Sequence, residues 1–161
     1  MTDTVEVDEL VAALIGLMGA LNNPRQDDAL LAEAGLDLDR ALFPLVARLG
    51  ALGPMGVAAL GDHAGRDHTT ISRQLAVLEE QGLVRRRANK DDRRVREAIL
   101  TAQGARVAQR IVTARRRLLT ELLADWSASE RKSFAALARK MAEGMRRMRD
   151  AQEAARASRP G

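Results

Sequence analysis

The feature that most constrains the fold is the order of three signals between residues 67 and 101. A helical pattern with many polar side chains comes first, and Gly82 ends it. Two short strand patterns follow at residues 84–87 and 95–100, separated by a polar, basic tip at residues 88–94. A helix followed directly by a basic two-stranded hairpin is typical of a winged helix-turn-helix.

The residues before this helix predict the other half of a helix-turn-helix. Apolar residues recur at helical spacing over residues 55–64, and Gly65 marks the end of that helix. Asp67 is the predicted N-cap of the second helix, because its carboxylate can accept from the backbone amides of Thr69 or Thr70. The side chains expected to face the core are Ile71, Leu75, Leu78 and Leu83.

Composition favours a mostly helical chain of one ordinary domain or two small lobes. Of the 161 residues, 46% are hydrophobic and only 2% are aromatic, so strand-forming aromatic side chains are scarce. Residues 1–40 hold nine acidic and two basic side chains, so the rest of the chain carries a net charge of +11 within the total of +4. This asymmetry indicates a polyanionic partner for the later part of the chain, although an arginine-rich genome would also produce it.

Helical patterns flank this central part on both sides. Before it we expect helices over residues 5–21, over a short stretch within 26–35, and from Asp37 or Asp39 to Leu49, with Pro44 delaying or kinking the last one. A loop is expected at residues 50–54. The helices expected after it are 102–124, capped by Thr101, and one that begins with the Ser127–Glu130 capping box and ends near residue 149. The expected fold is therefore mainly α with a small β-hairpin wing.

Several kinds of chemistry lack the residues that they need. The chain has no cysteine, and its two histidines, His63 and His68, are not placed on one helix face, so we expect no metal site and no cofactor. No glycine-rich phosphate loop or nucleophile with its base is present, which argues against an enzyme. The acidic N-terminus and the lack of a long apolar run predict a cytoplasmic protein that does not bind membranes.

The order of these elements resembles the MarR family of bacterial transcription regulators over nearly the whole chain. The most specific matches are Thr70-Ile71-Ser72-Arg73, the segment Leu78–Val84, and the wing motif from Asp92-Arg93-Arg94 to Leu100-Thr101. The resemblance implies a homodimer whose N- and C-terminal helices intertwine, with one winged helix on each half of a near-palindromic site in double-stranded DNA. It also implies a repressor that a small anionic or aromatic effector releases. Because aromatic residues are so few, we expect any effector pocket to be lined mainly by Leu, Met and Val, with an Arg for the anion. The organisation expected is a helical dimerisation region at 1–36 and 102–150, a DNA-binding lobe at 37–101, and a disordered tail at 151–161.

The expected DNA contacts lie on the second helix and on the hairpin. The N-terminal half of a recognition helix enters the major groove, and basic side chains of a wing reach the minor groove. Arg94 is the predicted minor-groove residue, and we expect Asp92 to hold its guanidinium in a forked ion pair. The full set of predicted contacts is Thr69, Thr70, Ser72, Arg73, Gln74, Arg87, Asn89, Lys90, Asp92, Arg93, Arg94 and Arg96.

A second hypothesis for the function is a nucleoid-type protein that binds DNA without sequence preference. It would account for the charge, but it does not require the polar pattern of the second helix. The methionine run at 141, 145 and 148 is expected to belong to the dimer core, because unbranched Met adapts to irregular packing.

Overall fold

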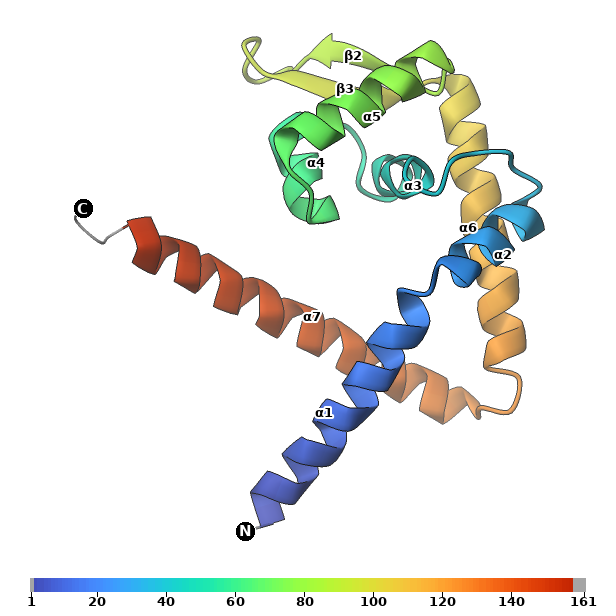
Figure 1. The fold of residues 1–161 in the computed structure, drawn as a ribbon, viewed down its shortest axis with the longest axis vertical. Helices are drawn as coiled ribbons and strands as arrows, with labels where there is room; N and C mark the ends of the chain where they lie inside the picture. Colours follow the sequence, from blue (N-terminus) through green and yellow to red (C-terminus); the bar gives the residue numbers. More distant parts are fainter. Residues whose placement is uncertain (1, 158–161) are drawn as a thin grey trace. The chain divides into compact units, whose positions relative to one another are not determined.

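The computed structural model of the chain describes the backbone of residues 2–157 and the side chains of residues 6–156. It divides into two compact units, residues 1–118 and 119–161 (Figure 1). The first unit contains the helix-turn-helix, the wing and the helices before them. The second contains the end of α6 and all of the last helix.

The first unit is built around six helices and a small antiparallel sheet. The helices are α1 (Thr2–Leu21), α2 (Pro24–Ala34), α3 (Phe43–Leu52), α4 (Val57–Ala64), α5 (His68–Glu80) and the greater part of α6 (Ala102–Leu122). The strands are β1 (Met55–Gly56), β2 (Val84–Ala88) and β3 (Arg96–Leu100), in the sheet order β1-β3-β2. Figure 1 shows α5 beside the β2–β3 hairpin, with α3 and α4 on the same side. A mainly helical fold with a small wing is therefore confirmed.

The observed boundaries of α3 differ from the expected ones at both ends. Pro44 delays α3 as expected, but the N-cap is Leu42 and not Asp37 or Asp39, and no side chain caps this helix. The carboxylate of Asp39 instead accepts from the amide of Ala41 in the preceding turn, at 2.6 Å. The expected loop at 50–54 is largely helical, because α3 continues to Leu52.

Strand β1 was not expected from the sequence. It occupies the first two positions of the predicted helix over 55–64, so that α4 begins only at Val57. Met55 pairs with Ala98 and Gly56 with Glu97, which adds a third strand to the edge of the hairpin. A two-residue strand has no periodic pattern of its own, and only its tertiary pairing reveals it.

One hydrophobic core holds α2 to α6 and the sheet together. It draws side chains from α2 to α6 and from both long strands, and among the described residues none comes from α1. The structure buries all four residues that were predicted to face the core from α5 and the residues just after it: Ile71, Leu75, Leu78 and Leu83. The fully buried large side chains are Leu45, Val46, Leu60, Ile71, Leu75, Leu78 and Ile111.

The wing and α6 meet at a very close contact. Gly104 lies against the carbonyl group of Leu83, and a Cβ atom there would overlap that oxygen and come within 2.9 Å of the carbonyl carbon. Thr101 caps α6 as expected, because its hydroxyl oxygen accepts from the amide of Gly104 at 3.0 Å. The same hydroxyl donates to the carbonyl oxygen of Gly82 at 2.6 Å. The base of the wing and the start of α6 therefore share one set of hydrogen bonds.

The second unit consists of the end of α6 and the long helix α7 (Ala128–Ala157). The predicted capping box is confirmed: the amide of Ser127 donates to Glu130 at 2.7 Å, and the amide of Glu130 donates to Ser127 Oγ at 3.2 Å. The expected disordered tail is wrong as far as Ala157, because α7 continues through residues that are mostly Ala, Arg, Gln and Glu. Residues 158–161, the rest of that tail, lie outside the described residues.

Replacement of Gly104 by Ala tests the contact between the wing and α6. Ala is the better helix former by about 1 kcal/mol, so helix propensity alone predicts a more stable protein. We expect the opposite, a loss of about 1 to 3 kcal/mol in the free energy of unfolding, because the Leu83 backbone must move. Denaturant unfolding measures the difference, with Gln103→Ala, an exposed change one residue earlier, as the near-neutral control. Stabilisation by Gly104→Ala would contradict the contact.

Candidate nucleic-acid interface

The N-terminus of α5 is fixed by Asp67, as the sequence predicts. The Asp67 carboxylate accepts from the Thr70 amide at 2.9 Å and from the Thr70 hydroxyl at 2.6 Å. These hydrogen bonds, first from the side chain and then from the backbone of Thr70, hold the pKa of Asp67 below its ordinary value of 3.8. The Thr70 hydroxyl thus has a partner inside the protein.

The polar residues predicted on α5 divide into an exposed pair and an enclosed set. Thr69 and Arg73 are exposed. Gln74 is half-buried, and its side-chain oxygen accepts from Arg66 Nη1 at 2.9 Å. Ser72 is also half-buried, and its carbonyl oxygen accepts from Arg86 Nη2 at 3.4 Å. Arg73 is therefore the cation that the exposed face of α5 presents.

Arg66, which sequence reasoning missed, holds the turn between the two helices. Its Nη1 donates both to Gln74 and to the carbonyl oxygen of Ala41, the latter at 2.9 Å, and its own amide donates to the carbonyl oxygen of Gly61. Gly65, immediately before it, adopts a left-handed conformation with a φ of 62°. The signal that could have found it is an Arg directly after a helix-ending Gly, where a long side chain can reach back across the turn.

The wing is an antiparallel hairpin in which Val84 pairs with Leu100 and Arg87 pairs with Glu97. Glu97 is buried and Arg87 is half-buried. The guanidinium of Arg87 donates to Glu97 Oε2 from Nε at 3.1 Å and lies 3.0 Å from it through Nη2. The positive charge of Arg87, a predicted DNA contact, is therefore paired inside the protein.

The wing tip is closed by side chains that bond to the backbone. The side-chain oxygen of Asn89 accepts from the amides of Asp91 and Asp92 at 2.8 and 3.0 Å. Asp92 Oδ1 accepts from the backbone amide of Arg94 at 3.0 Å. The amide of Val95 donates to the carbonyl oxygen of Asp92 at 3.0 Å. Hydrogen bonds therefore define the conformation of the tip.

The forked ion pair expected between Asp92 and Arg94 is absent from the described residues. Asp92 bonds instead to the backbone of Arg94, as Asp commonly does two residues ahead in a turn. The two residues are close in sequence and do interact, but the tight turn directs the carboxylate to the amide and leaves the guanidinium exposed. Asp92 therefore shapes the chain and does not aim the Arg94 side chain.

Most of the remaining basic side chains of the wing are exposed. Arg86 is the exception, since its Nε lies 3.0 Å from Glu79 Oε2 on α5, an ionic contact between hairpin and helix. The exposed cations on the strands and tip are Arg85, Lys90, Arg93, Arg94 and Arg96. Together with Arg73 on α5 they are the cations of the candidate interface, which lies on two adjacent elements.

Other kinds of site have little support in the described part of the chain. His63 and His68 are both exposed, and residues 2–157 contain no group of three His, Cys, Asp or Glu that could hold a metal ion. Over the same residues, no helix has the length and apolarity that crossing a bilayer requires.

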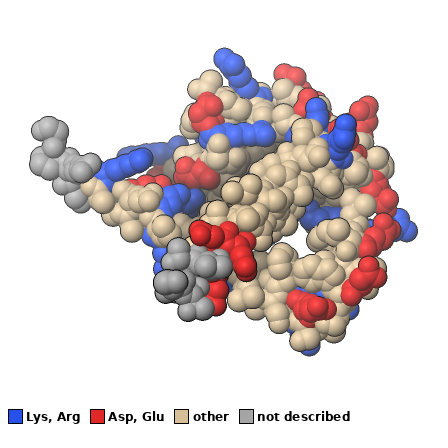
Figure 2. Space-filling view, turned by 60° about the horizontal axis from the view of Figure 1, so that its bottom comes forward, with Lys and Arg blue, Asp and Glu red and all other residues tan. Residues whose placement is uncertain are grey.

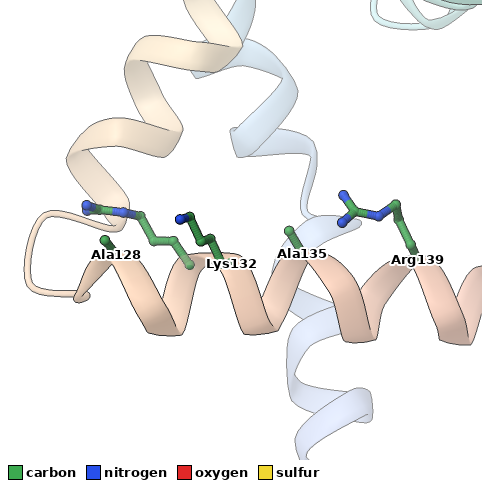
Figure 3. Close-up of a pocket in the computed structure, with 5 residues that line it drawn as sticks. Ala128, Lys132, Ala135 and Arg139 are labelled. Carbon is green, nitrogen blue, oxygen red and sulfur yellow. The ribbon is translucent and has the colours of Figure 1, made fainter.

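Two hollows lie outside the candidate interface. One, of about 200 Å³, lies between α2 and α6 and includes Arg110 and Arg117 in its lining. Arg110 donates to the carbonyl oxygens of Ala34 and Gly35, and Arg117 pairs with Glu33 at 2.8 Å. The other, of about 420 Å³, lies along one side of α7; Figure 3 shows Lys132 and Arg139 on the same side of the helix as two alanines. Both hollows have an Arg in their lining, as expected of an effector pocket, but neither has the expected Leu, Met and Val.

Comparisons with known proteins agree on the family. A sequence profile of the MarR family matches residues 38–95. The uncharacterized HTH-type transcriptional regulator YxaD of Bacillus subtilis (strain 168) is 30% identical over 105 residues, which are 65% of this chain and 73% of that protein. A MarR family transcriptional regulator from Silicibacter pomeroyi is 29% identical, with a TM-score of 0.61 over 73% of this chain and 80% of that one. A MarR family protein from Bacillus stearothermophilus shares the fold at 23% identity, with a TM-score of 0.71 over 86% and 96% of the two chains.

The cap at Asp67 predicts a specific dependence of stability on pH. Its pKa is lowered in the folded protein, so ionised Asp67 adds stability above about pH 4, and that contribution is lost as the pH falls through the lowered pKa. Asn can cap a helix but does not ionise. The difference in unfolding free energy between the parent and Asp67→Asn should therefore shrink between neutral pH and about pH 2. Denaturant unfolding across this range measures it; a constant difference would show that ionisation is irrelevant to the cap.

Proposed function

Because the chain belongs to the MarR family of transcription regulators, we propose that it is a homodimeric repressor that binds a near-palindromic operator. Each subunit places α5 in the major groove and its wing in the adjacent minor groove. The observation that carries the proposal is the exposed positive surface on α5 and the wing, built on a buried scaffold. A small anionic or aromatic effector would release the protein from DNA.

The proposed major-groove contacts come from the exposed side of α5. Arg73 is exposed and suits guanine, to which Arg commonly makes two hydrogen bonds. Thr69, one turn earlier, is exposed beside it and suits a phosphate or a base. The side-chain oxygen of Gln74 and the hydroxyl hydrogen of Thr70 already take part in hydrogen bonds within the protein. Only the NH₂ group of Gln74 and the hydroxyl oxygen of Thr70 are therefore available to DNA.

The proposed minor-groove contacts come from the wing tip. Arg94 is exposed while its backbone is fixed by Asp92, so its guanidinium can enter a narrow groove, where negative potential is strongest. Lys90, Arg93 and Arg96 surround it with further positive charge suited to phosphates. The contacts first predicted for Arg87 and Asn89 are less direct, since both bond to Glu97.

The proposed dimer uses the apolar surfaces of the first and last helices. On α1, Leu10, Ile15 and Met18 are 51%, 67% and 56% exposed, and on α7, Leu137 and Met145 are 63% and 64% exposed. A soluble domain rarely leaves two such stripes open, so a second copy is the occupant that best fits them. Figure 2 shows wide uncharged areas on one face of the molecule, with acidic and basic side chains at their edges.

Support for an effector is weaker than support for DNA binding. The hollow between α2 and α6 offers two guanidinium groups, but Arg110 and Arg117 already bond to groups of the protein. An anion would have to share or replace those partners. The basic hollow of α7 lies on the side of the helix opposite the apolar stripe and would remain open in the proposed dimer.

A nucleoid-type protein that coats DNA is the alternative, and footprinting over genomic fragments separates the two functions. A repressor should protect a discrete, near-palindromic segment, most usefully upstream of its own gene or of a divergently transcribed neighbour. Uniform protection of every fragment would replace the proposed function with the alternative.

Arg73→Ala should weaken binding to the protected operator by about 1 to 3 kcal/mol per half-site, because one base-edge contact is lost in each. It should also reduce discrimination at one base position per half-site. Arg25→Ala removes the same charge from α2, away from α5 and the wing in Figure 1, and should change the affinity little. Fluorescence anisotropy with the operator and its single-base variants measures both. Equal losses for the two variants would indicate binding by overall charge alone.

The protein should sediment as a dimer, at twice the 17.5 kDa of one chain. Leu137→Glu places a charge in the apolar stripe of α7 and should shift the equilibrium toward monomer, because the carboxylate would be buried without a partner. Ala136→Glu adds the same group to an exposed position outside the stripe and should leave the dimer intact. Analytical ultracentrifugation at micromolar concentration distinguishes them. A monomeric parent with full helical content would refute the proposed assembly.

A further inference from the structure

Among the described residues, Glu97 is the one buried charged side chain, at 4% exposure. It lies on β3 in the wing, the element that carries the exposed cations. Burial of a carboxylate is costly unless hydrogen bonds and an opposite charge compensate it. Here Arg87 compensates the charge through Glu97 Oε2, and Asn89 Nδ2 donates to Glu97 Oε1 at 2.7 Å. An apolar side chain would fill the same position without these requirements, so the carboxylate calls for another explanation.

The carboxylate decides which way the Asn89 amide faces. An ionised carboxylate can only accept hydrogen bonds, so Asn89 must turn its NH₂ group toward Glu97. Its oxygen then faces the tip, where it accepts from the amides of Asp91 and Asp92. Asp92 in turn accepts from the amide of Arg94. A continuous series of hydrogen bonds, which we call the wing relay, thus runs from Arg87 through Glu97, Asn89 and Asp92 to the backbone of Arg94.

We propose that Glu97 is a positioning residue for DNA binding, which orders the wing tip through Asn89 before DNA arrives. This rests on the proposed function, because the ordered tip matters only if the tip contacts DNA. Residues 90–94 of the tip are exposed and receive no support from the hydrophobic core. Without the relay, binding would have to order the tip, and the lost conformational entropy would lower the affinity.

The relay predicts weaker DNA binding when the Glu97 charge is removed, whereas simple electrostatics predicts stronger binding. Loss of a negative charge close to a DNA-binding surface should strengthen attraction to phosphates. In Glu97→Gln, however, Arg87 needs the oxygen of the new side chain, so the new NH₂ group faces Asn89. Asn89 must then turn its oxygen toward that NH₂ group, which brings its own NH₂ group to the tip. There it faces the amides of Asp91 and Asp92, which are also donors, so no hydrogen bond can form. The tip loses its acceptor.

A reversed pair restores the relay with the net charge unchanged. In Asn89→Asp alone, two carboxylates face each other. In the double variant Asn89→Asp/Glu97→Gln, the oxygen of the introduced Gln accepts from Arg87, and its NH₂ group donates to one oxygen of the introduced Asp. The other oxygen of that Asp accepts from the tip amides. The double variant therefore keeps the same pairs of hydrogen-bonded groups and the same net charge as the parent, but the carboxylate and the amide are exchanged and Arg87 bonds to an amide oxygen.

The test compares the two single variants, the double variant and the parent on the footprinted operator, by fluorescence anisotropy. We expect each single variant to bind DNA about tenfold more weakly than the parent, because the hydrogen bond between residues 89 and 97 and the hydrogen bonds of the tip that rely on it are lost. The affinity of the double variant should lie within about threefold of that of the parent. Glu80→Gln, an exposed carboxylate on α5, is the matched control and should bind as tightly as the parent or more tightly. Tighter binding by Glu97→Gln, or a double variant with the summed losses of the single ones, would overturn the proposal.

Hydrogen exchange in the free protein provides a readout that does not depend on DNA. The amides of Asp91, Asp92 and Arg94 should exchange faster in both single variants and at the parental rate in the double variant. The amide of Ile99, on β3, reports whether the hairpin itself remains folded. If the parent gives no discrete footprint, the proposed function fails, and the exchange data still decide whether the relay orders the tip. Unchanged exchange in Glu97→Gln would refute the relay.

Discussion

The contact between the first turn of α6 and the backbone of Leu83 is the constraint on which the arrangement of the first unit depends. The amide of Leu83 donates to the carbonyl oxygen of Leu78 at the end of α5, and its carbonyl oxygen accepts from the amide of Thr101 after β3. Gly104 allows α6 to begin directly on that peptide unit. One residue thus joins α5, both ends of the hairpin and α6.

The basic side chains of this unit serve two purposes. Arg66 donates to Gln74 and to the carbonyl oxygen of Ala41, and Arg87 donates to Glu97. Arg86 donates to the carbonyl oxygen of Ser72 and forms an ion pair with Glu79. Arg73 and Arg94 remain exposed on the helix and the wing tip that these internal bonds fix. A positive patch read from composition alone mixes the two groups, although only the second is available to a polyanion. Their separation depends on strand register and on the turn geometry around Gly65.

Much of the fold and part of the site could be predicted from the sequence, because they follow from local rules. The caps at Asp67 and Thr101 and the core positions Ile71, Leu75 and Leu78 are set by residues within a few positions of one another. Features that depend on pairing across the chain could not be predicted in this way. Strand β1 exists only through its pairing with β3, and the burial of Glu97 depends on its position opposite Arg87. The orientation of Asp92 depends on a tip conformation that Asn89 determines.

If α5 enters the major groove as proposed, the hydrogen bond between Arg66 and Gln74 limits how much sequence information one subunit can read. With the Gln74 oxygen occupied and the Thr70 hydroxyl donating to Asp67, few unoccupied polar groups remain on the outer face of α5. Each half of a target site would then contain few bases that are read directly. The rest of the discrimination would fall to the width and flexibility of the duplex under the wing, as is common where contacts to bases are sparse. Related target sites should therefore share a shape more closely than they share a sequence.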